Sequence, residues 1–122
     1  MEPFETLHVW HDARTLTKLI YQATRGSKFR SDRALTVQLN RAAISVMSNI
    51  AEGRERGGDK EFRRFLMIAK GSCGEIRSQL YAAEDLGYLD HDESARLRTY
   101  AAGISRKLHA LALSLALSLP SS

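Results

Sequence analysis

Apolar residues recur every three or four positions over most of the chain, the spacing that places them on one face of an α-helix. Four such stretches are separated by short polar or glycine-containing segments. We predict helices over about residues 7–24, 32–52, 60–85 and 91–118. The predicted core stripes are Val9, Trp10, Ala13, Leu16 and Ile20; Leu35, Leu39, Ala42, Val46 and Ile50; Phe62, Phe65, Leu66, Ala69, Cys73, Ile76, Leu80 and Ala83; and Leu97, Tyr100, Ile104, Leu108, Leu111 and Leu115.

Polar residues with short side chains precede the predicted helices and are typical N-caps. The candidates are Thr6, Ser31 or Asp32, Asp59, and Asp90 with Glu93 three residues on. Gly53 is predicted to stop the second helix, Gly87 to follow the third and Pro120 to close the fourth. In the segment between the first two helices, Phe29 is expected to pack back on the core.

Short connections favour an up-down-up-down antiparallel four-helix bundle, so residues 1–122 are predicted to form a single all-α domain. The alternating run "LALSLALSL" imitates a strand, but no second segment has a strand pattern to pair with it. We therefore predict a helix there.

Two of the predicted helices are apolar on more than one side. A monomeric bundle buries one apolar stripe per helix. The additional apolar residues of these two helices are therefore predicted to be buried between subunits of a homo-oligomer. Scattered exposed aliphatic residues, which are common on any surface, are the alternative. The predicted interface residues are Val37, Ile44, Met47, Ala51, Leu113 and Leu117.

Composition narrows the class of protein. The chain of 122 residues is 43% hydrophobic and 26% charged, typical of one soluble globular domain. It has a single cysteine, no secretory signal pattern, and an apolar run about half as long as a membrane span requires. We expect a cytoplasmic protein that does not enter a membrane.

The net charge of +4 is concentrated in the middle of the chain, where residues 25–70 hold 11 Lys and Arg against 5 Asp and Glu. Arg63, Lys70 and Arg77 are seven residues apart, which places them on one helix face over about 21 Å. An unneutralised row of this kind suits a phosphate backbone, and a solvated face or pairing with acids of another subunit are the alternatives. The predicted nucleic-acid-binding residues are Arg54, Arg56, Lys60, Arg63, Lys70 and Arg77.

Other chemistry is sparse. His8 and His11 are close in sequence but have no further ligand at a metal-site spacing, and Cys73 lies on an apolar stripe. No catalytic triad or phosphate loop is present, so we predict no enzyme, catalytic residue, metal, cofactor or small-molecule substrate. Gly71 and Gly74 in a helix interior indicate that a helix or a phosphate approaches the backbone there.

The stretch "SNIAEGRERGGDKEF" is predicted to form a structural turn from Asn49, Glu52 and Gly53. A carboxylate at a helix C-terminus faces the negative end of the helix dipole, so Glu52 needs another partner. We expect it to turn toward the free amides at the start of the third helix.

Several segments resemble a known family. "QLNRAAISVMSNIAEG", "EFRRFLMIAKGS", Glu75 with Ser78-Gln79-Leu80, and "DLGYL" are similar to the bacterial four-helix bundle proteins encoded in intervening sequences of 23S ribosomal RNA genes. A more distant similarity is to accessory variability proteins of diversity-generating retroelements. The resemblance implies an all-α bundle and a homo-oligomeric ring, with a pentamer as the expected form.

The retroelement proteins are associated with nucleic-acid and reverse-transcriptase binding through basic surfaces, whereas the intervening-sequence proteins imply no particular activity. We therefore expect a non-enzymatic, oligomeric helical-bundle protein that binds RNA or DNA through the basic face of the third helix. The alternative is a protein-interaction scaffold that docks a partner protein and binds no nucleic acid.

Overall fold

The computed structural model describes residues 2–118, and the fold is all-α, with no strand in that part of the chain. The elements are the 3-10 helix η1 (Phe4–Thr6) and the α-helices α1 (His8–Ala23), α2 (Ser27–Arg30), α3 (Arg33–Glu55), α4 (Asp59–Asp85) and α5 (His91–Ser118). The four long helices confirm the predicted all-α four-helix fold of the chain.

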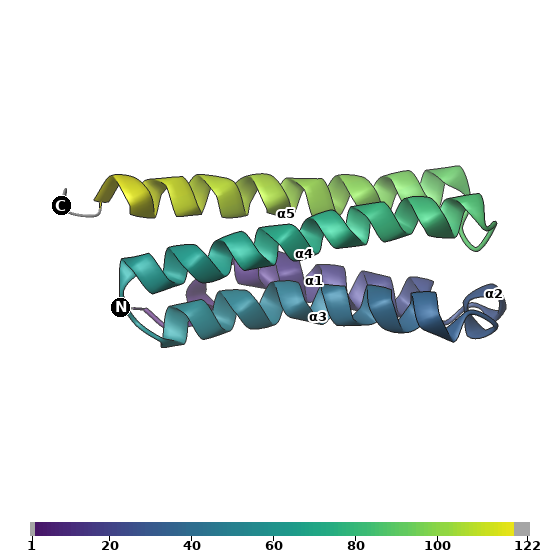
Figure 1. Ribbon diagram of the computed structural model, residues 1–122, viewed down its shortest axis with the longest axis horizontal. Coiled ribbons are helices and arrows are strands. Elements are labelled where there is room, and N and C mark those ends of the chain that lie inside the picture. Colours follow the sequence, from purple (N-terminus) through teal and green to yellow (C-terminus); the bar gives the residue numbers. More distant parts are fainter. Residues whose placement is uncertain (1, 119–122) are drawn as a thin grey trace.

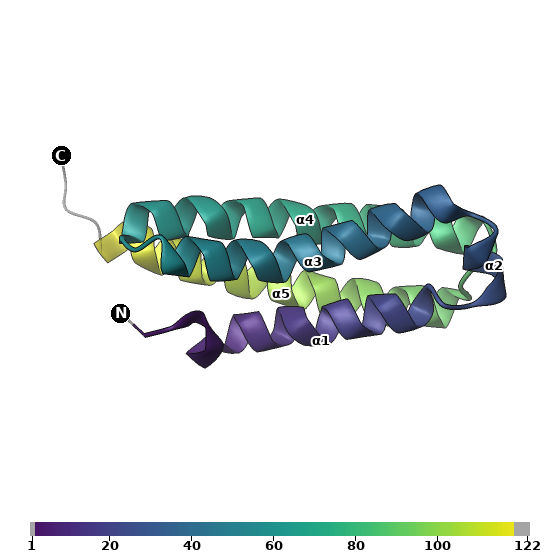
Figure 2. The same ribbon diagram turned by 90° about the horizontal axis from the view of Figure 1, so that it is seen from below.

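The long helices lie side by side along one axis and alternate in direction (Figures 1 and 2). Consecutive long helices pack against each other, and α1 closes the bundle by packing on both α3 and α5. Over residues 2–118, α1 does not contact α4. These two helices therefore occupy diagonally opposite corners of the bundle, and their outer faces point away from each other (Figure 2).

The core consists largely of the predicted stripes. Every predicted core residue of α4 is buried, and burial of each large apolar side chain contributes about 1.5–3 kcal/mol. Five predicted core residues are only half-buried, and three alanines join the core instead. The half-buried residues are Trp10, Leu35, Tyr100, Leu111 and Leu115, the three additional alanines are Ala43, Ala101 and Ala112, and Leu89 between α4 and α5 joins the core as well.

The helices differ in length, which leaves one end of α5 uncovered. α1 has 16 residues and α5 has 28, or about 24 Å against about 42 Å at 1.5 Å per residue. The C-terminal end of α5 therefore extends beyond α1 (Figures 1 and 2). Leu113 and Leu117 in this part are 52% and 80% exposed.

Two of the predicted N-caps are confirmed. Asp32 Oδ1 accepts a hydrogen bond from the amide of Leu35 at 3.1 Å, and Asp90 Oδ1 accepts one from the amide of Glu93 at 2.7 Å. Gly87, with φ of +78°, follows α4 as predicted. Pro120 lies outside the described residues.

The other two N-cap predictions, Thr6 and Asp59, were wrong. The hydroxyl of Thr6 donates to the carbonyl of Pro3, and Leu7 caps α1 with extended backbone instead. Gly58 caps α4 with φ of +84°, a conformation that side chains disfavour, so Asp59 is the first residue of the helix.

The connection between α1 and α3 contains one unpredicted element, the short helix α2. Its Phe29 is 1% exposed and its ring lies 5.2 Å from that of Tyr88, so the expectation that Phe29 packs back on the core is confirmed. The hydroxyl of Tyr88 donates to Asp32 at 3.0 Å, which ties this end of the bundle to the start of α3.

Gly53 does not stop a helix, because α3 continues to Glu55. The glycine is buried, and a Cβ placed on it would lie 2.5 Å from the Cβ of Phe65 and 3.3 Å from Cδ1 of Phe62. Real Cβ atoms essentially never approach that closely. The absence of a side chain at residue 53 therefore permits the close packing of α3 on the first turns of α4.

Gly53→Ala is expected to destabilise the protein by about 1–3 kcal/mol, because the added methyl group overpacks the contact with Phe65. Gly71→Ala is the matched control, since nothing lies within 4 Å of a Cβ there and alanine stabilises a helix by about 0.5–1 kcal/mol relative to glycine. Urea unfolding of both variants measures the two changes. Equal stability of Gly53→Ala and the wild type would contradict this account of the turn.

Candidate nucleic-acid interface

Four of the predicted binding residues form a basic edge along α4, which we call the α4 basic edge: Lys60, Arg63, Lys70 and Arg77. Lys70 Nζ lies 3.4 Å from Nδ1 of His109, which places the middle of this edge at the seam with α5. Lys70 is half-buried and the other three are exposed. Within residues 2–118 none of the four makes an ion pair, so their charges are not neutralised inside the protomer.

The two arginines at the end of α3 do not extend this edge as free cations. Arg54 Nε donates to the carbonyl of Glu2 at 2.7 Å, and its guanidinium lies 5.1 Å from the ring centre of Phe62. Arg56 pairs with Glu52 at 3.0 Å and lies 5.0 Å from the ring centre of Phe65. Both side chains are held at the turn between α3 and α4 by contacts of their own.

The expected role of Glu52 needs correction. Its carboxylate pairs with Arg56 one turn later on α3, so it does not turn to the amides of α4. An acid and a base at this i, i+4 spacing stabilise an exposed helix end by about 0.2–0.5 kcal/mol. Arg56 is thus the partner that offsets the unfavourable helix dipole.

Asn49 lies about two turns before the connection, at the seam between α3 and α4. Its Nδ2 donates to the carbonyl of Ser45 at 2.8 Å and to Oγ of Ser45 at 2.9 Å. That Oγ lies 2.9 Å from Oγ of Ser72, which is 5% exposed on α4. This small network satisfies polar groups in the seam and links the two helices.

The outer face of α4, together with Leu86 just after the helix, also carries apolar residues that the sequence reasoning missed. Met67, Ile68, Tyr81 and Leu86 are 42–57% exposed. Gly71 and Gly74 lie among them, and nothing in the described part of the chain approaches within 4 Å of a Cβ at either position. The signal was present in the sequence, because these residues fall opposite the predicted core stripe of this helix.

The predicted interface residues separate into two patches. Val37 and Ile44 are 40% and 41% exposed on the outside of α3, where Met47 and Ala51 are half-buried. The other two predicted residues lie at the exposed end of α5. These two helices do not contact each other within residues 2–118, so the patches lie on different sides of the bundle.

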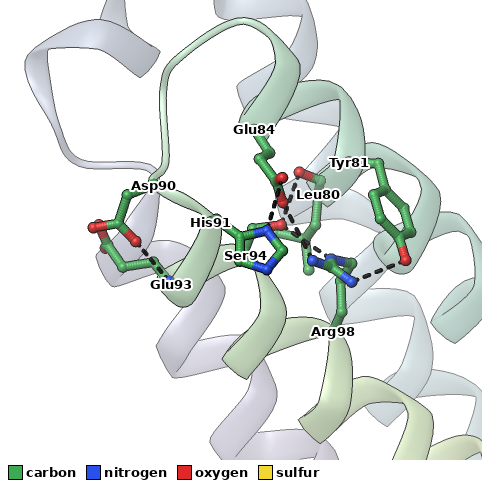
Figure 3. Close-up of polar contacts among 8 residues, drawn as sticks. All are labelled: Leu80, Tyr81, Glu84, Asp90, His91, Glu93, Ser94 and Arg98. Atoms are coloured by element: carbon green, nitrogen blue, oxygen red, sulfur yellow. Dashed lines mark hydrogen bonds and ion pairs between the residues drawn. The ribbon is translucent and has the colours of Figure 1, made fainter.

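A polar cluster joins the end of α4 to the start of α5 (Figure 3). Arg98 is its centre: the guanidinium donates to Oε1 of Glu84 at 3.2 Å, to the hydroxyl of Tyr81 at 2.9 Å and to Oγ of Ser94 at 3.1 Å. Buried Ser94 in turn donates to the carbonyl of Leu80. All three nitrogens of Arg98 are thus engaged, so this arginine fixes the two helices relative to each other.

The hydrogen bond from His91 at 3.0 Å is the main cause that lowers the pKa of Glu84 below its ordinary value, and the positive charge of Arg98 acts in the same direction. Burial raises the pKa of the Cys73 thiol to about 12, against a smaller opposing effect of Arg77. Cys73 is therefore a protonated core residue at neutral pH.

The histidines do not gather into a ligand set. His8 and His11 are exposed, and Nε2 of His11 lies 2.6 Å from the carbonyl of Glu5. Among residues 2–118 no three His, Cys, Asp or Glu side chains are grouped to hold a metal ion. In the same part of the chain no helix is both long and apolar enough to span a membrane.

The fold and its surfaces define a small antiparallel four-helix bundle protein in which the outer face of α4 is basic and partly apolar. The chain belongs to the family of 23S rRNA-intervening sequence proteins, whose family model matches residues 5–110. This membership confirms the resemblance to the intervening-sequence proteins.

Among solved structures, the chain is similar to a protein of unknown function from the S23 ribosomal protein family of Bacteroides thetaiotaomicron. The two share 17% sequence identity with a TM-score of 0.78, over 85% of this chain and 97% of that one. At this identity the similarity establishes the fold alone. Comparison with curated proteins finds no match.

Replacing Glu84 by Gln is expected to lower stability above pH 4.5, by an amount that disappears as the pH falls through the lowered pKa of Glu84 in the folded protein. A carboxyl group whose pKa is lowered by folding stabilises the protein above its unfolded pKa, and this contribution disappears as the pH falls through the folded pKa. Thermal unfolding at a series of pH values measures the difference. Glu75→Gln, an exposed carboxylate of α4 that makes no ion pair within residues 2–118, is the control. A constant difference between wild type and Glu84→Gln at all pH values would contradict the assignment.

Proposed function

We propose that this chain is a non-enzymatic, self-associating helical-bundle protein that binds RNA or DNA through the α4 basic edge. The observation that carries the proposal is the absence of ion pairs for Lys60, Arg63, Lys70 and Arg77 within residues 2–118. Neutralising a phosphate with such a cation releases a condensed counterion, and this release drives binding.

The shape of the edge supports contacts to the backbone of a nucleic acid rather than to its bases. The cations are strung along one rigid helix over about 21 Å between Arg63 and Arg77. Phosphate contacts of this type position a protein but carry no sequence information directly. We therefore expect binding with little sequence preference.

A second candidate function is a scaffold that docks a partner protein. The exposed apolar residues of α4, Met67, Ile68, Tyr81 and Leu86, favour it, because exposed apolar patches often mark protein interfaces. The open surface at Gly71 and Gly74 would let another helix approach closely. Binding to such a surface depends weakly on salt, whereas phosphate binding depends on it steeply.

The combined change of Arg63, Lys70 and Arg77 to Ala tests the first proposal. For duplex DNA the slope of log K against log salt should fall by about 3, and for a single strand by about 2, because three phosphate contacts are lost. Fluorescence anisotropy with structured RNA, single-stranded DNA and duplex DNA across a salt series measures the slope.

The matched control changes Arg30, Arg33 and Arg41 to Ala. It removes the same charge from exposed positions on α2 and α3, none of which makes an ion pair within residues 2–118. Equal effects of the two triple changes would show that net charge alone matters. No binding at low salt would leave the scaffold as the better proposal.

A further inference from the structure

A second basic surface lies on the outer face of α1. Arg14, Lys18 and Tyr21 are spaced by four and three residues on α1, which places them within about 60° of one another over about 10 Å, and Arg25 follows in the turn just after the helix. All four side chains are exposed, and Tyr21 is exposed by 37%. We call these four residues the α1 face.

The three cations of the α1 face are not neutralised. None of them makes an ion pair within residues 2–118, and Arg14 instead lies 5.8 Å from the ring centre of Trp10. The nearest acid in sequence, Asp12, is paired with Lys107 of α5 at 2.6 Å.

The neighbouring sequence adds positive charge. Residues 13–51 contain seven Lys and Arg and a single acid, Asp32. The carboxylate of Asp32 caps α3 and accepts the Tyr88 hydroxyl, so it does not face these cations as a free charge. These cations add to the positive potential around α1 and α3, and the α1 face supplies its own three charges next to the hollow described below.

A hollow of about 530 Å³ lies between α1 and α3 beside these cations. Its α1 side carries Arg14, Lys18, Tyr21 and Arg25, and its α3 side carries Ile44 and Met47. Positive charge therefore adjoins an aromatic ring and an apolar wall. A single strand fits this chemistry, because its phosphates can contact the cations while an unstacked base lies on Tyr21 and the apolar wall. A duplex keeps its base faces stacked and would use only the cations.

We propose that the α1 face is a second contact site for single-stranded nucleic acid. It is independent of the α4 basic edge because α1 and α4 are at diagonal corners and do not touch within residues 2–118 (Figure 2). Each chain then holds two strands on opposite sides, a capacity that a single basic edge does not give. The count of two strands per chain rests on the proposed nucleic-acid binding by the α4 basic edge, whereas binding of a strand to the α1 face does not.

The stoichiometry of binding tests the proposal. A fluorescent oligothymidylate of about eight nucleotides is titrated at low salt into the wild type, an α1 variant (Arg14→Gln, Lys18→Gln, Arg25→Gln) and the α4 triple variant, with bound strands counted by sedimentation. We expect two strands per chain for the wild type and one for each variant. Counting strands per chain makes the result independent of the number of subunits.

Two further measurements isolate the α1 face in the α4 triple variant. Affinity should fall about 20-fold between about 50 and 200 mM salt, as three contacts to a single strand require. Tyr21→Ala should weaken binding by at least about fivefold, while Tyr21→Phe, which keeps the ring, should not. The control removes Arg30, Arg33 and Arg41 and should leave both sites intact.

The outcomes separate the two proposals. One strand per chain in the wild type, unchanged in the α1 variant, would overturn this inference and leave the α4 proposal standing. One strand that is lost only in the α1 variant would keep the α1 site and overturn the α4 proposal. A change of assembly mass in the α1 variant, seen by light scattering, would show that the α1 face is a contact between copies and would overturn the inference too.

Discussion

A Cβ at residue 53 would lie 2.5 Å from the Cβ of Phe65, so α3 and α4 can pack this closely only because residue 53 is glycine. The contact buries Phe62 and Phe65 under the last turn of α3. Their rings then receive Arg54 and Arg56, one on each ring at about 5 Å. These two arginines are thus held at the turn, and the row of α4 cations that make no ion pair within residues 2–118 starts at Lys60.

The charge of the rest of the surface is determined by which acids form ion pairs and which cations do not. Ion pairs hold Asp12, Glu52, Glu61 and Glu84 to cations of the same protomer. A modest net charge of +4 therefore appears as separate basic strips on α1 and α4. Such strips attract polyanions more strongly than the net charge suggests, because the local potential depends on the nearest charges at physiological salt.

Periodicity was sufficient to predict the helices and most of the core. N-cap predictions were also correct where the capping side chain bonds to an amide close by in sequence. Asp32 and Asp90 each accept a hydrogen bond from the amide three residues on. The role of Gly53 was not predictable in this way, since a glycine that ends a helix and one that permits close packing look the same in sequence. Phe65, which decides between them, lies across the turn on another helix.

The candidate site was predicted in part for a similar reason. Spacing along one helix correctly placed Arg63, Lys70 and Arg77 along the same edge. The partners of Arg54 and Arg56 include a backbone carbonyl from the N-terminal segment and two aromatic rings, and none of these contacts follows from spacing. To predict the α1 face from the sequence, one would need to know that α1 and α4 lie at diagonal corners of the bundle and which α3 residues lie next to α1.

Ile44 and Met47 connect strand binding to assembly. They line the hollow beside α1 and also belong to the apolar patch of α3 that is expected to contact another copy. The second apolar patch lies at the end of α5 on another side, and a contact between two unlike patches is head-to-tail, the type that closes into rings. If α3 forms one half of that contact, a copy and a nucleic-acid strand compete for the same two side chains. Linkage then requires each to weaken the binding of the other by the same factor, so a ring held through α3 binds a strand at the α1 face more weakly than a free chain does, and a saturating concentration of strand fills that face while weakening the contact between copies.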